Sequence, residues 1–223
     1  MITLKSSIAV FRKDLASEFR RRYAISSIVL FVLTSVSVII FSTKGETLTE
    51  AMAAAILWVV MFFGSMTGLS KSFISEEERG TALLLQIAAP ASSVYFGKLL
   101  FNIVLDISLN ILAAFLFFLF FGFEFIKNFT IFFLTLTLGS LALASASTVI
   151  SAIIAKARSK NALFPVLSFP LVLPIILIGV ETTLASFQNA EFSFVAGSFR
   201  LLFAYSGVMI TASYMLFGFI WKE

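Results

Sequence analysis

A polar stripe inside a long apolar stretch is the clearest candidate for chemistry in this sequence. Asp106 lies within the apolar run, and Asn102 and Asn110 lie four residues before and four residues after it. Side chains four residues apart share one face of a helix. In a membrane, such a face meets other helices or a water-filled cavity. We interpret the stripe as a pathway lining or gate, or as a cluster of interhelical hydrogen bonds; no second ionisable group stands nearby for a proton relay.

A second polar segment, residues 75–90, separates two apolar segments. It reads SEEERGTALLLQIAAP. Ser75 and Glu78 have the spacing of a capping box, and acids in a first helical turn interact favourably with the helix dipole. Pro90 should end the helix at or before Ala89. We predict one short helix here, too short to cross a membrane. It would dock on a cytoplasmic partner or lie on lipid head groups.

The residue types that are missing exclude most catalytic chemistry. The sequence contains no cysteine and no histidine. Disulfides and thiolate chemistry are therefore excluded, and the commonest metal ligand and general base are absent. No GxxxxGK[ST] phosphate-binding motif is present, so the chain has no such route to ATP hydrolysis. We predict no catalytic residues, no metal site and no directly bound cofactor.

The composition places these groups in a membrane protein. Of the 223 residues, 60% are apolar and 13% are charged, and the mean hydropathy is +1.05. No polar stretch is long enough for a separate soluble core, so residues 1–223 should form one transmembrane domain in contact with lipid. The net charge of +4 does not gather into a long basic surface, and we expect no nucleic-acid partner.

Six apolar segments can cross a bilayer. We predict spans over residues 24–42, 51–70, 99–122, 129–155, 162–180 and 199–221. Residues 1–23 alternate apolar and basic groups at helical spacing and should form an amphipathic elbow helix in the membrane surface. Residues 181–198 are more polar and are assigned to the periplasmic side.

The fifth predicted span contains three prolines, Pro165, Pro170 and Pro174. A proline inside a helix removes a backbone hydrogen bond and kinks or breaks the helix. We therefore expect an irregular span, and we assign Pro170 and Pro174 to the pathway or gate together with the polar stripe.

The basic residues set the orientation. If both termini lie on one side, 13 of the 16 Lys and Arg residues lie on that side, and only Lys44, Lys127 and Arg200 lie on the other. Lys and Arg are enriched in cytoplasmic loops. We predict a multi-pass protein of the bacterial inner membrane with both termini and the 75–90 helix in the cytoplasm.

Several residue runs resemble the CcmB family, the permeases of cytochrome c maturation also called haem exporter protein B. The similar runs are Phe11-Arg12-Lys13-Asp14-Leu15 with Glu18 and Arg20, Glu76-Glu77-Glu78-Arg79-Gly80 followed by Leu83-Leu84-Leu85, Pro90 and Lys98, then Leu136-Thr137-Leu138-Gly139-Ser140, and the spacing from Leu163 to Pro170 and Pro174. Their order covers nearly the whole chain.

This resemblance implies an all-α integral membrane fold of the type-2 ABC exporter kind: six transmembrane helices, an N-terminal elbow helix and a cytoplasmic coupling helix at 75–90. The residues expected to contact the ATPase are Glu76, Glu77, Glu78, Arg79, Gly80, Leu83 and Leu84.

The resemblance also implies partners. The chain would pair, as two copies, with an ABC ATPase subunit like CcmA that holds ATP. It would work beside a haem-handling membrane protein like CcmC and a periplasmic haem chaperone like CcmE. Haem would be cargo reached through these partners. The alternatives are a type-2 ABC permease for a lipid, glycan or drug, and a scaffold for haem-handling proteins that transports nothing.

Overall fold

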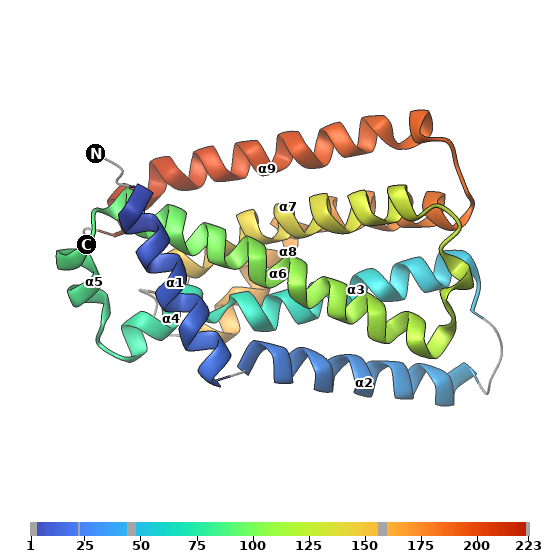
Figure 1. Cartoon of the computed structure of the whole chain (residues 1–223), viewed down its shortest axis with the longest axis horizontal. Helices are drawn as coiled ribbons and strands as arrows, with labels where there is room; N and C mark the ends of the chain where they lie inside the picture. Colours follow the sequence, from blue (N-terminus) through green and yellow to red (C-terminus); the bar gives the residue numbers. More distant parts are fainter. Residues whose placement is uncertain (1–3, 22, 44–47, 156–159, 222–223) are drawn as a thin grey trace.

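The computed structural model describes residues 4–21, 23–43, 48–155 and 160–221, which form helices joined by short links, without strands (Figure 1). The helices are α1 (Leu4–Arg21), α2 (Tyr23–Thr43), α3 (Glu50–Leu69), α4 (Lys71–Glu78), α5 (Ala82–Ala88), α6 (Ala91–Phe121), the short 3₁₀ helix η1 (Phe123–Phe125), α7 (Phe129–Ala155), α8 (Lys160–Phe187) and α9 (Phe192–Ile220). The start of α1, helix α5 and the end of α9 lie at the same end of the bundle (Figure 1).

Five helical stretches are long and apolar enough to cross a membrane. They are Glu50–Glu78, Ala91–Phe121, Phe129–Ala155, Val166–Phe187 and Phe192–Phe219. Within the described part of α2, the apolar run Val29–Ser42 is shorter than these. The structure therefore supports five of the six predicted spans. The remaining one, the first span over residues 24–42, stays a prediction.

The single helix predicted over residues 75–90 is wrong. The acids end α4 instead of opening a helix, and α5 begins only at Ala82. Gly80 has φ +66°, the left-handed conformation that glycine adopts readily. The Gly80 amide donates to Glu77 O at 3.1 Å and the Thr81 amide to Glu76 O at 2.9 Å. This pair of bonds is a Schellman motif, which terminates a helix.

Two other predicted segments also differ in their bounds. Helix α8 continues through its prolines without a break. Pro174 has no amide to donate to the carbonyl four residues before it. In the same turn, the Tyr205 hydroxyl of α9 donates to Leu171 O at 2.6 Å. Residues 181–198 do not form a separate segment, because 181–187 complete α8 and α9 begins at Phe192. Their periplasmic position stays a prediction.

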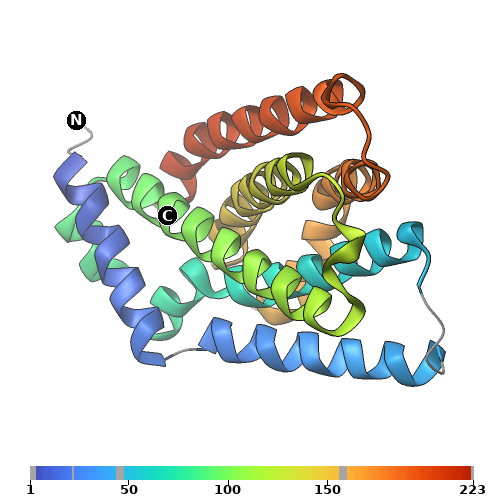
Figure 2. The same ribbon diagram turned by 45° about the vertical axis from the view of Figure 1, so that its right-hand side comes forward.

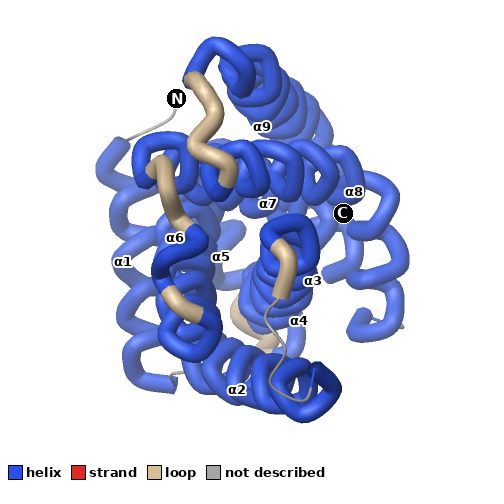
Figure 3. Tube along the Cα trace, turned by 90° about the vertical axis from the view of Figure 1, so that its right-hand side faces the viewer, coloured by secondary structure: helices blue, strands red, loops and turns tan. Residues whose placement is uncertain are grey.

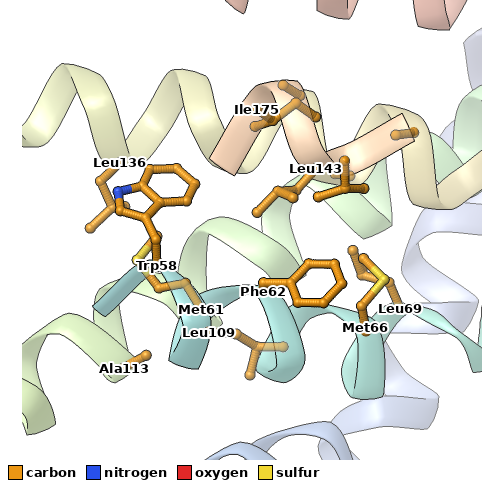
Figure 4. Close-up of a cluster of buried hydrophobic side chains, with 14 of the residues drawn as sticks. Trp58, Met61, Phe62, Met66, Leu69, Leu109, Ala113, Leu136, Leu143 and Ile175 are labelled. Atoms are coloured by element: carbon orange, nitrogen blue, oxygen red, sulfur yellow. The ribbon is translucent and has the colours of Figure 1, made fainter. Parts of the chain in front are cut away.

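Helix α3 is the centre of the bundle. It packs against α2, α6, α7 and α8, which surround it in the end view (Figure 3). Its Trp58 is buried among apolar neighbours that include Met61 and Leu136 (Figure 4). A Cβ added to Gly139 of α7 would lie 2.3 Å from the Trp58 ring, and one added to Gly179 of α8 would lie 2.2 Å from it. The two glycines thus make room for the indole between three helices.

Helix α1 lies against the first part of α6 (Figure 2). A Cβ added to Gly97 of α6 would lie 2.7 Å from both Ser7 O and Val10 Cβ of α1, so only glycine permits this approach. The contact buries Val10, whereas Leu4 and Phe19 remain exposed. The predicted amphipathic helix is present, with much of its apolar side uncovered; its position as an elbow in the membrane surface stays a prediction.

Candidate functional site

A buried lysine organises the end of the bundle that carries α5. Helix α6 begins at Ala91, eight residues before the predicted span, and therefore includes Lys98. The Lys98 side chain is 1% exposed. Its Nζ lies 3.1 Å from Asp14 Oδ2 of α1 and 3.3 Å from Glu76 Oε1 of α4, and it donates to Ser72 O at 2.6 Å. One ammonium thus joins three helices.

Two further groups complete this charge network. Lys13 Nζ lies 3.0 Å from Asp14 Oδ1 and also contacts Glu76 Oε1. Thr81, in the link between α4 and α5, donates to Glu76 Oε2 at 2.6 Å. We call Lys13, Asp14, Glu76, Lys98 and Thr81 the charge network. It connects the α5 link directly to α1 and α6.

The charge network offsets the unfavourable position and burial of the Glu76 carboxylate. Glu76 lies near the C-terminal end of α4, where the helix dipole disfavours an acid, and it is largely buried. The ammonium groups of Lys13 and Lys98 compensate for both effects. Burial by itself lowers the pKa of Lys13, but the carboxylates of Asp14 and Glu76 outweigh burial and raise that pKa above its ordinary value of 10.5.

A polar cavity of about 650 Å³ adjoins the charge network. It is lined by residues of α1, α4 and the α4–α5 link, among them Arg20 and Arg79, and by Gly68, Phe101 and Leu105. The cavity therefore separates α1 from α4 beside the ion pairs, and a movement of either helix would change its volume.

Helix α5 presents an apolar surface to its surroundings. Leu83, Leu84 and Ile87 are 70%, 67% and 85% exposed. At its other side Gln86 donates to Trp221 O at 2.6 Å, which ties α5 to the end of α9. An uncovered apolar face on a seven-residue helix is suited to contact with a partner or with lipid.

The predicted polar stripe is fully buried in the middle of the bundle. Asn102 donates to Thr148 Oγ1 of α7 at 2.8 Å, and Asn110 donates to Ser140 Oγ of α7 at 3.0 Å. Asn110 also donates to Asp106 Oδ2 at 3.2 Å. The stripe is thus an interhelical hydrogen-bond cluster between α6 and α7. Its role as a pathway or gate stays a prediction.

The remaining predicted residues are not gathered at one place. Of the acidic stretch, Glu76 belongs to the charge network, Glu77 is half-buried, and Glu78 and Arg79 are exposed. Pro170 and Pro174 are exposed on α8, which packs mainly on α7, α3 and α9 and not on the polar stripe of α6.

The predicted site omitted four residues of the charge network: Lys13, Asp14, Lys98 and Thr81. Asp14 and Lys98 are 84 residues apart, so no local pattern joins them. The available signal was that Lys98 directly precedes a long apolar stretch, where an unpaired charge is costly.

This arrangement is that of a multi-pass helical membrane protein whose charged groups connect helices. Among the described residues, no group of three or more acids could hold a metal ion. The family model described as CcmB protein matches residues 5–219, and the chain therefore belongs to the CcmB family. It is a membrane transport component in cytochrome c biogenesis, of the permease-subunit type. A search of curated proteins finds no match to the chain.

Proposed function

We propose that this protein is the permease subunit of an ABC complex in haem trafficking for c-type cytochrome biogenesis. Two copies would pair with a separate ATPase subunit like CcmA, beside membrane and periplasmic haem-handling proteins like CcmC and CcmE. ATP hydrolysis on the partner would drive haem export or release of the haem-loaded chaperone. Family membership supports the general role. The observation that carries the coupling role is the exposed apolar face of α5 next to the charge network.

The contacts of α5 suggest how force would pass into the bundle. The ATPase would seat on Leu83, Leu84 and Ile87. The link behind them is short and held by the Schellman motif, and Thr81 donates to the same Glu76 carboxylate that pairs with Lys98. A displacement of α5 would therefore move α4 and pull on α6 through this carboxylate.

Haem would be held by partner proteins. Histidine and cysteine, two common axial ligands of haem iron, are absent from the sequence. In this proposal the chain supplies the membrane path or the mechanical coupling, and the partners supply ligation.

The proposed location is the bacterial inner membrane with cytoplasmic termini. The positive-inside distribution supports it, as does the grouping of the start of α1, α5 and the end of α9 at one end of the bundle (Figure 1).

The first experiment is gentle-detergent purification of the tagged chain from its host, with mass spectrometry of the co-purifying proteins. An ATPase together with haem-handling membrane proteins supports the proposal. An ATPase without them favours export of another substrate, and the absence of any ATPase contradicts both ABC interpretations.

The second experiment tests the face of α5. Leu83→Glu combined with Leu84→Glu should abolish ATPase co-purification without loss of membrane insertion, because it places charges in an apolar contact. Phe129→Glu is the matched control: Phe129 is 66% exposed, and the acid would lie at the N-terminus of α7, where the helix dipole favours it. Equal ATPase binding by the double variant and the control would remove α5 from the proposed interface.

A further inference from the structure

The surroundings of Asp106 contain hydrogen-bonding groups but no opposite charge. Asp106 is completely buried in α6. Its neighbour Asn110 accepts a hydrogen bond from Ser65 of α3 and donates one to Ser140 of α7. Asn110 Nδ2 donates to Asp106 Oδ2 at 3.2 Å. Asp106 Oδ1 has no hydrogen-bond partner.

The charged residues of the neighbouring helices are engaged or exposed elsewhere. Helix α7 contains no ionisable side chain, and neither does the run Val29–Ser42 of α2. Glu50, the one acid of α3, lies at its far end and pairs with Lys127 at 2.7 Å. Lys13 and Lys98 each pair with both Asp14 and Glu76 in the charge network, and Arg200 of α9 is exposed.

An ionised carboxylate at this position would therefore have the Asn110 amide and the Ser65 hydroxyl as donors but no cation within the described bundle. A buried charge without a partner is strongly unfavourable, and such a group takes its neutral form instead. One helical turn away on the same face, Asn102 Oδ1 is also buried and lacks a donor. The stripe thus has unused acceptor capacity on two side chains, which a proton bound to one of them would reduce.

We propose that Asp106 is an intramembrane proton-binding site: in the closed bundle its carboxyl group holds one proton on Oδ1. The proton comes from water and returns to water, as the carboxylic acid dissociates to a carboxylate and a hydrated proton. Dissociation requires water to reach the contact of α6 with α3 and α7. Opening of this contact would release the proton and closing would take it up. The site is a single acceptor and not part of a proton relay.

The sequence contains two aspartates, Asp14 and Asp106, so labelling of aspartate reports on these two carboxyl groups. The full chain labelled with ¹³C at the aspartate carboxyl carbon would be reconstituted in lipid near pH 7 and measured by solid-state NMR and infrared spectroscopy. We expect two carboxyl populations: a carboxylate from the ion-paired Asp14 and a carboxylic acid from Asp106, whose infrared carbonyl band shifts in deuterated water.

Two variants assign the signals. Asp14→Asn should leave the carboxylic-acid signal in place, and Asp106→Asn, which substitutes a neutral side chain of similar shape, should remove it. Two ionised carboxyl groups in the wild-type chain would overturn the proposal even if neither variant folds. Loss of the acid signal in Asp14→Asn would also overturn it. The measurement needs no ATPase or haem protein, so its result is independent of the proposed function.

Discussion

Lys98 of α6 and Asp14 of α1 form a buried ion pair, with 3.1 Å between Nζ and Oδ2, although 84 residues separate them in the sequence. The pair determines where α1 lies on α6. Glu76 accepts from the same Nζ, so the position of α4 depends on it as well.

Replacing Lys98 by methionine should destabilise the protein by about 3–5 kcal/mol, because it leaves two largely buried carboxylates with a single cation. Unfolding in mixed detergent–SDS micelles would measure the change. Lys127→Met is the matched control, since the Lys127–Glu50 pair is exposed and should contribute less than about 1 kcal/mol. Equal losses of stability in the two variants would show that the buried charge network contributes no more than an exposed ion pair.

Lys13→Met should cost about 1 kcal/mol or less, because the Lys13 side chain is 44% exposed and solvent screens its ion pairs. The folded-state pKa of Lys13 is raised, so its contribution is fully present below 10.5 and is lost only as pH rises through the folded-state pKa. The cost of the substitution should therefore be the same near pH 7 and near pH 9. A cost that vanishes near pH 9 would contradict the raised pKa.

Gly179→Ala should destabilise the bundle by about 1–3 kcal/mol, because the new methyl group would overlap the Trp58 ring. Gly207→Ala in α9 is the control, since nothing lies within 4 Å of its added Cβ. Thermal unfolding in detergent would compare them. Trp58→Phe combined with Gly179→Ala should recover part of the loss; strict additivity of the two substitutions would argue against the contact.

Gly97→Ala should displace α1 from α6, because its Cβ would meet Ser7 O and Val10 at 2.7 Å. The chain has no cysteine, so Val10→Cys provides a unique reporter at a buried position. A water-soluble maleimide should label this cysteine slowly in the wild-type background and faster with Gly97→Ala. Gly218→Ala, which has open space around its Cβ, should leave the labelling rate unchanged.

Gly80→Asn should be tolerated, because asparagine accepts the left-handed conformation at φ +66° better than other non-glycine residues. Gly80→Pro should disrupt the α4–α5 link, because proline fixes φ near −65° and removes the amide that donates to Glu77 O. In a reconstituted complex, Gly80→Pro combined with Glu77→Lys should uncouple ATP hydrolysis from chaperone release while the chain still inserts. Normal coupling in that variant would contradict the proposed role of the link.

The class of protein and most helix positions follow from the amino-acid sequence alone. Apolar runs of sufficient length predicted 129–155 with the bounds of α7 and came close for α3, because membrane-spanning helices depend on local composition. The order of short motifs indicated the CcmB family, which the family model confirms. Local patterns also placed Asn102, Asp106 and Asn110 on one face of α6.

The contacts of these residues depend on how the helices pack, which local sequence patterns do not specify. The acids at 76–78 suggested the start of a helix, but Gly80 in the left-handed conformation makes them its end, and Lys98 and Lys13 offset the unfavourable position of Glu76. Those cations come from helices distant in sequence. Hydrogen bonds and ion pairs act over a few ångströms in space and carry no periodic signature along the chain, so the charge network became visible only in the folded bundle.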